Sequence, residues 1–245
     1  MLLGILTVLS ALLAALICVG VGGGIVAYIL GFAGSFLVLT ALAFGFFYVM
    51  CQIIDPNKPQ EEDSRFYRRL IHLYVDAILT VARVKIITKG MDQLPRSGRF
   101  MLVCNHRDNI DPAFLLTCFR NSQLAFISKR EVQGFFLVGK VMHKLLCQPI
   151  NRENDREALK TIVRCIQIIK EDKASIAVFP EGYIYDDRKL HHFRPGVFKI
   201  ATKTKVPIVV CTMHGTHEVL PKAFKLKPSQ VQMHLLQVIY PEDYE

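Results

Sequence analysis

The chain has 245 residues, 51% of them hydrophobic, and a net charge of +9. Residues 1–54 contain no Lys, Arg, Asp or Glu, so the whole net charge lies in residues 55–245, which are enough for one well-buried core. Such a basic domain favours an anionic lipid surface or anionic substrates. Nucleic acid is not an expected partner, because zinc-finger spacing, a helix-turn-helix and an aromatic-basic RNA signature are missing. We therefore expect a membrane segment, residues 1–54, and a globular domain, residues 55–245.

The membrane segment is predicted to form two helices. Apolar runs at Leu2–Val19 and Ile25–Met50 are separated by a glycine-rich turn, Gly20–Gly24. A single helix over the whole stretch would be about 80 Å long, far more than the ~30 Å hydrocarbon core of a bilayer. Two arrangements stay open: both helices span the bilayer, or they enter and leave through one leaflet. A cleaved signal peptide is less favoured, since no basic residue precedes the first apolar run.

Charge and cysteine patterns predict where the globular domain lies. Basic residues follow the second apolar run, whereas the glycine turn has no charge. By the positive-inside rule, the protein is expected to be an integral membrane protein with its globular domain on the cytoplasmic face. The seven cysteines are widely spaced without a C-x-x-C pair, as expected for reduced core thiols in a reducing compartment.

Residues 64–83 follow a short linker and have helical periodicity. Apolar residues fall on one face, including Leu70 and Tyr74, and the opposite face is polar and includes Arg69 and His72. Two interpretations are equally supported by this pattern: an amphipathic helix at the membrane interface, or an ordinary helix that covers one side of the core.

Beyond residue 83 the pattern alternates between strands and helices. The expected strands are Val84–Thr88, Phe100–Cys104, Leu124–Ser128, Ser175–Phe179, Val206–Thr212 and Val231–Ile239. The expected helices are Pro112–Arg120, Glu131–Leu146, Asp155–Lys170 and Pro195–Lys205. This alternation predicts an α/β fold with a mixed, largely parallel sheet flanked by helices.

The turn between the strand Phe100–Cys104 and the helix that follows contains a candidate general base. His106 lies five residues before Asp111, a spacing that allows the carboxylate to fold back on one ring nitrogen and leaves the other free to take a proton. His106 and Asp111 would then correspond to the base of a catalytic triad and the carboxylate that orients it. The nucleophile of the triad is missing, and a hydroxyl of the substrate can take its place. Asp111 before Pro112 is also a good helix N-cap, and both roles can coexist.

A second group of candidate residues lies on the same predicted sheet edge. Glu181 and Gly182 follow the strand Ser175–Phe179, as His106 follows its own strand, and ligands bind at the carboxyl ends of strands in open α/β sheets. Arg152 offers a planar fork of donors suited to a phosphate, and the basic segment Arg188–Arg194 offers more positive charge. No metal is expected, because the histidine pairs at 191–192 and 214–217 have no carboxylate or thiolate at ligand spacing.

These pieces together resemble the glycerolipid acyltransferase family, whose best-known members are the 1-acylglycerol-3-phosphate (lysophosphatidic acid) acyltransferases. Asn105–Asp111 is similar to the family's N-H-x4-D motif and Ile150–Arg152 to its second motif, which ends in arginine. Phe179–Gly182 matches the F-P-E-G motif and Val206–Val209 the V-P-I-V motif. The resemblance extends from about residue 84 to the end of the chain.

The resemblance implies transfer of an acyl group from acyl-CoA or acyl-carrier protein to the hydroxyl of a lysophospholipid, with no other cofactor. It implies that His106 is the base and Asp111 orients it. The substrate-binding residues expected from the motifs and their basic surroundings are Asn105, Arg152, Glu181, Gly182, Arg188 and Arg194.

Three alternatives qualify this interpretation. The family commonly continues F-P-E-G with Thr and a basic residue, whereas Tyr183 and Ile184 follow here, so another lysophospholipid acceptor is an open alternative. A membrane-tethered hydrolase or thioesterase is less favoured, because no G-x-S-x-G elbow follows a strand. A kinase is rejected, because the asparagine required after an H-R-D motif is Ala113 here.

Overall fold

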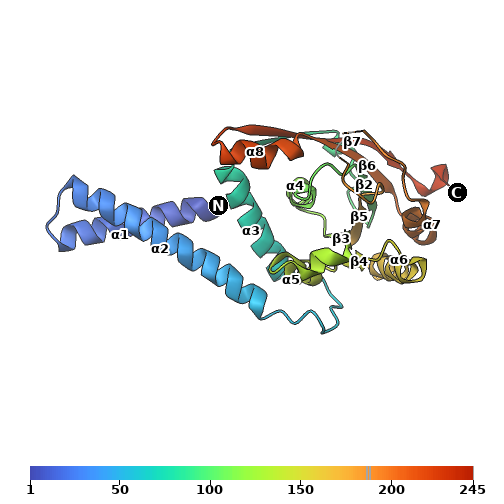
Figure 1. Cartoon of the computed structure of the whole chain (residues 1–245), viewed down its shortest axis with the longest axis horizontal. Helices are drawn as coiled ribbons and strands as arrows, with labels where there is room; N and C mark the ends of the chain where they lie inside the picture. Colours follow the sequence, from blue (N-terminus) through green and yellow to red (C-terminus); the bar gives the residue numbers. More distant parts are fainter. Residues whose placement is uncertain (186, 188, 245) are drawn as a thin grey trace. The chain divides into compact units, whose positions relative to one another are not determined.

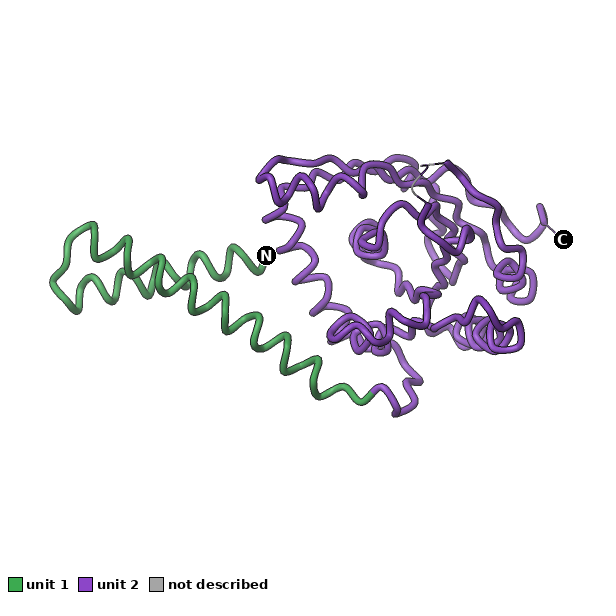
Figure 2. Tube along the Cα trace, viewed as in Figure 1, with its two compact units in different colours: residues 1–55 green, residues 56–245 purple. Residues whose placement is uncertain are grey.

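The structure, a computed structural model, describes residues 1–185, 187 and 189–244. The chain divides into two compact units, Met1–Asp55 and Pro56–Glu245 (Figure 2). Each unit is described by itself below.

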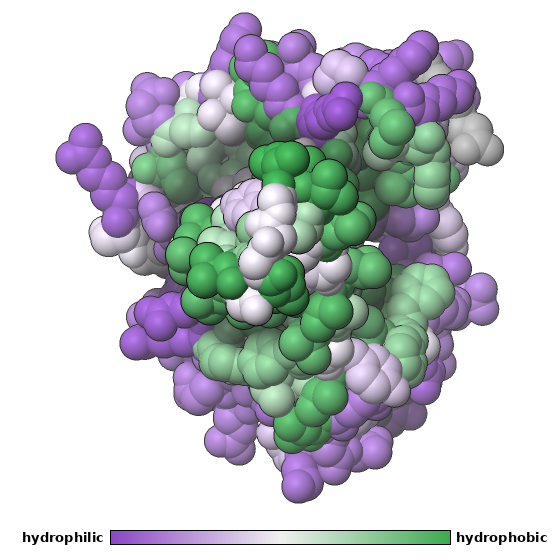
Figure 3. Space-filling view, turned by 90° about the vertical axis from the view of Figure 1, so that its left-hand side faces the viewer, coloured by the Kyte–Doolittle hydropathy of each residue, from purple (hydrophilic) through white to green (hydrophobic). Residues whose placement is uncertain are grey.

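The first unit is a hairpin of two antiparallel helices, α1 (Leu2–Gly20) and α2 (Ile25–Gln52). The turn between them is glycine-rich, and Gly22 adopts a left-handed φ of 59° there. Apolar side chains cover the surface of this hairpin, which Figure 3 shows end-on. In the described part of the chain, these two helices are long and apolar enough to cross a membrane, which indicates membrane association.

The second unit is built around a seven-stranded sheet within the described residues. Its strands are β1 (Val84–Lys89), β2 (Met101–Cys104), β3 (Leu124–Lys129), β4 (Gln148–Ile150), β5 (Ser175–Val178), β6 (Ile208–His214) and β7 (Ser229–Ile239). The strand order is β1-β7-β6-β2-β5-β3-β4. Only the β6–β7 pair is antiparallel among the paired strands described, so the predicted mixed, largely parallel sheet is confirmed.

Strands β2, β3, β4, β5 and β6 all end at one edge of the sheet, which we call the carboxyl edge. Because β7 runs antiparallel to β6, and β1 runs parallel to β7, strands β1 and β7 begin at the carboxyl edge. Loops that follow five strands and precede the other two therefore meet along one side of the unit. In open α/β sheets this is the side where ligands bind.

Helices cover both faces of the sheet. They are α3 (Arg65–Val81), α4 (Asp111–Cys118), α5 (Val138–Lys144), α6 (Asp155–Lys170), α7 (Lys199–Thr204) and α8 (Val219–Phe224), with 3-10 turns at Met91–Gln93, Arg130–Gly134, Pro195–Phe198, Thr216–Glu218 and Pro241–Asp243. Figure 1 shows α3 and α4 on one face and α6 and α7 on the other. The face under α6 and α7 holds a buried core that includes Val103, Ile168, Ile176 and Ile200.

Three segments differ from the elements predicted from sequence. The helix expected at Glu131–Leu146 is broken into a 3-10 turn and α5, because Gly139 packs against the backbone of Gln133 where any side chain would clash. Strand β4 and helix α8 were not predicted, since each is too short to have a periodicity of its own.

Helix α3 begins at Ser64, whose hydroxyl accepts a hydrogen bond from the backbone N–H of Tyr67. The helix packs against α4, α5 and β1. Its Arg68 is buried and forms a two-pronged ion pair with Asp63, at 2.6 Å for the shortest N–O distance. The prediction that His72 lies on the polar face with Arg69 is wrong, because His72 is buried whereas Arg69 is exposed.

The environment of His72 makes the stability of the fold depend on pH. Among the described residues neither ring nitrogen has a hydrogen-bond partner. Burial lowers the pKa of His72 below its ordinary value of 6.5, and the charges of Arg120 and Arg68 lower it further. Below about pH 6.5 the unfolded chain therefore takes up a proton that the folded chain resists, so acid favours unfolding.

We expect the melting temperature of the full chain to fall as the pH is lowered through 6.5, and the variant His72→Gln to show a weaker dependence. His192→Gln, which replaces an exposed histidine, is the control and should leave the dependence unchanged. Equal pH profiles for wild type and His72→Gln would show that His72 is not responsible. Thermal unfolding followed by circular dichroism between about pH 5 and pH 8 is the measurement.

Candidate active site

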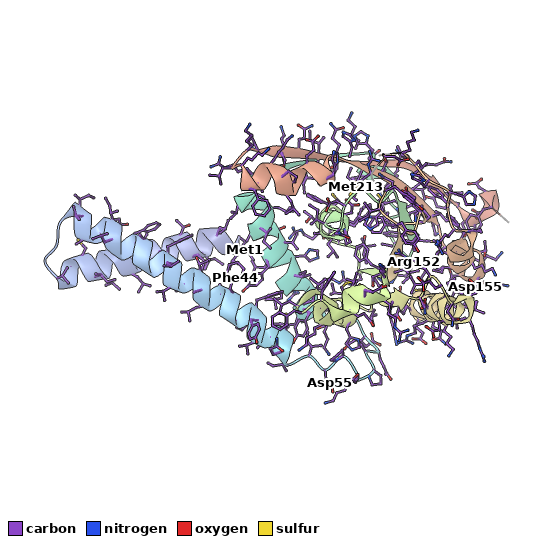
Figure 4. The ribbon with its side chains drawn as sticks, in the orientation of Figure 1. Met1, Phe44, Asp55, Arg152, Asp155 and Met213 are labelled. Carbon is purple, nitrogen blue, oxygen red and sulfur yellow. The ribbon has the colours of Figure 1, made fainter. Side chains whose placement is uncertain are left out.

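The turn after β2 is bonded to the neighbouring strand β6 by Asn105. Its side-chain oxygen accepts hydrogen bonds from the backbone N–H of Met213, at 2.7 Å, and from the hydroxyl of Thr212. Its amide nitrogen donates to the carbonyl of Met213, at 3.1 Å. Figure 4 labels Met213 on β6. Asn105 thus fixes the position from which the next residue, His106, projects.

His106 and Asp111 are in direct contact, as the sequence spacing predicts. The Nδ1 atom of His106 lies 2.8 Å from Oδ2 of Asp111, and the carboxylate is fully buried. The same oxygen accepts hydrogen bonds from the backbone N–H groups of Arg107 and Asp108, at 2.6 and 2.9 Å. Asp111 is the first residue of α4 rather than its N-cap, which is Ile110, so its carboxylate serves the turn and the imidazole. The histidine is held in one orientation with its ring 15% exposed.

Glu181 connects this turn to a second loop. Its buried carboxylate accepts hydrogen bonds from the backbone N–H of His106, at 3.0 Å, and from that of His191, at 3.3 Å. The ring of His106 also stacks on Phe179, with 4.1 Å between ring centroids. The F-P-E-G segment therefore supports both the backbone and the ring of His106.

Two arginines converge on one aromatic ring beside Gly182. The guanidinium carbons of Arg152 and Arg194 lie 4.9 and 5.3 Å from the ring centroid of Tyr183, distances typical of cation–π contacts. Gly182 has a φ of 77°, and a Cβ atom there would come within 3.0 Å of the Arg194 side chain. The left-handed φ favours glycine here, and a larger residue would also displace the side chain of Arg194 by a few tenths of an ångström.

A cavity of about 290 Å³ opens beside these arginines. Its walls are largely apolar and include Ile127, Ile162 and Val178, and the charged residues in its lining are Arg152, Arg194 and Asp155. Figure 4 labels Arg152 on the segment between β4 and α6. Burial lowers the pKa of Arg152, which means that its charge is incompletely solvated and would be stabilised by a bound anion.

Phe179 also lines this cavity, and its ring stacks on the imidazole of His106. The cavity and the imidazole thus contact the same residue. A larger hollow, of about 550 Å³, contains none of the predicted site residues in its lining.

The structure brings the predicted residues together in two adjoining groups. His106, Asp111, Asn105 and Glu181 form the first through hydrogen bonds. The second, around the cavity, contains Arg152, Gly182 and Arg194. Arg188 lies outside the described residues.

Sequence reasoning missed the contacts of Phe179 and Tyr183. The F-P-E-G motif contains Phe179 without indicating that it stacks on His106. For Tyr183, the sequence did contain a signal, because this residue departs from the family pattern. Among the described residues, His, Cys, Asp and Glu form no group of three that would hold a metal ion.

Comparisons with known proteins identify the family to which the chain is similar. Residues 85–214 match the family model described as acyltransferase. A probable 1-acyl-sn-glycerol-3-phosphate acyltransferase of Mycoplasma pneumoniae is 30% identical over 194 residues, which cover 76% of this chain and 70% of that protein. A chloroplastic 1-acyl-sn-glycerol-3-phosphate acyltransferase of Brassica napus is 31% identical over 63% of this chain, which spans less than half of the plant protein (46%).

A solved structure supports the fold. The crystal structure of the 1-acyl-sn-glycerophosphate acyltransferase PlsC from Thermotoga maritima superimposes with a TM-score of 0.59 at 20% sequence identity, over 86% of this chain and 84% of that chain. The family match covers more than half of the 245 residues. It includes the turn at His106, the strands β5 and β6 on either side of β2, and the F-P-E-G segment. This chain belongs to the acyltransferase family.

Proposed function

We propose that the protein transfers a fatty acyl group from a thioester, acyl-CoA or acyl-carrier protein, to the free hydroxyl of 1-acylglycerol-3-phosphate, giving phosphatidic acid. The observation that carries the proposal is the 2.8 Å contact between His106 Nδ1 and the buried carboxylate of Asp111. In the proposal, Asp111 accepts a hydrogen bond from the proton on Nδ1, and the other ring nitrogen, Nε2, takes the proton of the acceptor hydroxyl. The names of the relatives from Mycoplasma and Brassica support the choice of acceptor.

The reaction follows from this arrangement. Nε2 of His106 takes the proton of the acceptor hydroxyl while the hydroxyl oxygen attacks the thioester carbonyl. Asp111 stabilises the imidazolium that forms. The carbon–sulfur bond then breaks, and the imidazolium returns its proton to the leaving thiolate. No metal or bound cofactor takes part in the proposed reaction.

Arg152 and Arg194 are proposed to hold the phosphate of the acceptor. Both guanidiniums line the cavity, and Phe179, whose ring stacks on His106, lines it as well. A planar guanidinium binds phosphate oxygens through paired hydrogen bonds. In this proposal Glu181 and Asn105 position the turn, and Gly182 leaves room for Arg194.

The test is an assay of the full-length protein in lipid vesicles with labelled acyl-CoA, in buffer with EDTA. Labelled phosphatidic acid should form when 1-acylglycerol-3-phosphate is the acceptor. Labelled free fatty acid without a diacyl product would show that the protein is a hydrolase and not a transferase. A panel of lysophospholipids tests the alternative acceptors raised by Tyr183, and acyl-carrier protein thioesters test the donor.

The two helices of the first unit are proposed to anchor the enzyme as an integral membrane protein with residues 56–245 on the cytoplasmic face. The charge-free hairpin and the basic residues that follow it support this orientation. Protease added outside sealed, right-side-out vesicles should leave the globular unit intact until detergent opens them. Cleavage of that unit before detergent is added would reverse the proposed topology.

A further inference from the structure

The surface formed by the C-terminal end of α3 and the segment of α8 and its following turn is called the α3–α8 corner. The two segments lie side by side (Figure 1), and Nη1 of Arg83 donates a hydrogen bond to the carbonyl of Leu226, at 3.1 Å. The large apolar side chains exposed at this corner are Ile78, Val81, Leu220, Phe224 and Leu226. Phe224 is 87% exposed and Leu226 is 75% exposed, so neither side chain contributes much to the core.

The backbone at Leu226 supports a role outside folding. The residue has a φ of 53°, the left-handed conformation that glycine or asparagine ordinarily adopts just after a helix. A bulky leucine is disfavoured in this conformation. A residue that is unfavourable for the local backbone and that gains little from burial is better explained by contact with something outside the chain.

Charge identifies that contact. The same two segments carry four basic residues: Arg83, Lys222, Lys225 and Lys227. Lys222 pairs with Glu218, whereas Lys225 and Lys227 are exposed. Two copies of such a corner would repel each other, and lysine is depleted from protein–protein interfaces. Apolar side chains bordered by lysines match the interfacial region of a bilayer that contains anionic lipids.

The position of the corner connects it to the candidate active site. Gln232 of β7 pairs with His214 at the end of β6, and Ser229 pairs with Val84 at the start of β1. The corner therefore lies at the carboxyl edge, the edge from which the turn of His106 projects. A membrane contact here would turn that edge toward the surface where lipid substrates are found.

We propose that the α3–α8 corner is a second membrane contact, separate from the helical hairpin, which inserts Phe224 and Leu226 into the interface of an anionic bilayer. The proposal rests on residues of the globular unit and on the membrane association of the chain. It does not depend on the identity of the acyl acceptor.

The chain has no tryptophan, so a single introduced tryptophan reports its own surroundings. Phe224→Trp places the probe at the corner, and Tyr240→Trp is the control at the opposite end of β7, on the order of 30 Å away along the strand. Both full-length variants are reconstituted in vesicles of phosphatidylcholine with and without phosphatidylglycerol, with brominated acyl chains as quencher. We expect the tryptophan of Phe224→Trp to be quenched more strongly when phosphatidylglycerol is present, and that of Tyr240→Trp to be unaffected by bromine.

Charge removal provides the second measurement. Lys225→Gln with Lys227→Gln, in the Phe224→Trp background, should lower the ratio of docked to undocked protein by about 25-fold, since each lysine near an anionic surface contributes roughly fivefold. If the fluorescence of Phe224→Trp is as insensitive to bromine as that of Tyr240→Trp, the proposal is overturned. A blue shift in Phe224→Trp that depends on protein concentration but not on bromine would also overturn it, because a second copy would then be the occupant.

Discussion

Replacement of His106 by alanine is expected to lower kcat for acyl transfer by about 10²- to 10⁴-fold, the usual effect of removing a general base. The acceptor hydroxyl is a weak nucleophile until its proton is taken, and the pair formed by His106 and Asp111 provides the acceptor for that proton. The KM values should change little, because the imidazole stacks on Phe179 and is 15% exposed, so it adds little surface for ground-state binding.

A matched control and a second variant distinguish catalysis from structure. His143→Ala removes a histidine whose ring nitrogen contacts the linker carbonyl of Lys58, at 3.0 Å, and should leave kcat unchanged. Asp111→Asn should also lower kcat, because the amide cannot stabilise the imidazolium. Unchanged turnover in His106→Ala, with wild-type circular dichroism and melting temperature, would remove His106 from the mechanism and favour a lipid-binding role for the site.

The sequence was sufficient to predict this pair because local spacing and sheet topology act together. Four residues separate His106 from Asp111, so one turn brings them into contact wherever the rest of the chain lies. Parallel strands end at the same edge, so Glu181 could be expected near His106 although 75 positions separate them in the chain. The alternation of strands and helices likewise predicted the mixed sheet.

Other features depend on tertiary contacts that periodicity does not report. The helix predicted at Glu131–Leu146 is interrupted in the structure. Gly139 lies against the carbonyl of Gln133, a contact that the hydrophobic pattern does not report. His72 was predicted to belong to a polar face, yet its side chain is buried, while Arg65 and Arg69 of the same predicted face are exposed. Asn105 was predicted to bind substrate, yet the described contacts of its side chain are to the neighbouring residue and to β6.

Tyr183 departs from the family motif, and the structure shows which residues its ring contacts. A tyrosine and an isoleucine occupy the places where the family commonly has Thr and a basic residue. In the structure, the ring of Tyr183 contacts Arg152 and Arg194, which come from two different loops. Positive charge is therefore supplied to the cavity from elsewhere in the chain, and the aromatic ring holds both guanidiniums near each other despite their repulsion.

The double variant Arg152→Gln with Arg194→Gln is expected to lower kcat/KM for 1-acylglycerol-3-phosphate by on the order of 10²- to 10⁴-fold. Each charge-assisted hydrogen bond to phosphate contributes about 1.5–3 kcal/mol, and both guanidiniums line the same cavity. Most of the loss should appear in KM for the acceptor, since binding of a spectator phosphate stabilises ground state and transition state alike. Glutamine retains most of the side-chain length and removes the charge.

Two comparisons make this prediction specific to the phosphate of the acceptor. Arg130→Gln removes an exposed arginine that pairs with Glu157 and does not line the cavity, so it should change kcat/KM little. A monoacylglycerol, which has the hydroxyl but no phosphate, should be acylated equally poorly by wild type and by the double variant. If the double variant instead raises KM for acyl-CoA and leaves KM for the acceptor unchanged, the arginines bind phosphates of the donor and not the phosphate of the acceptor.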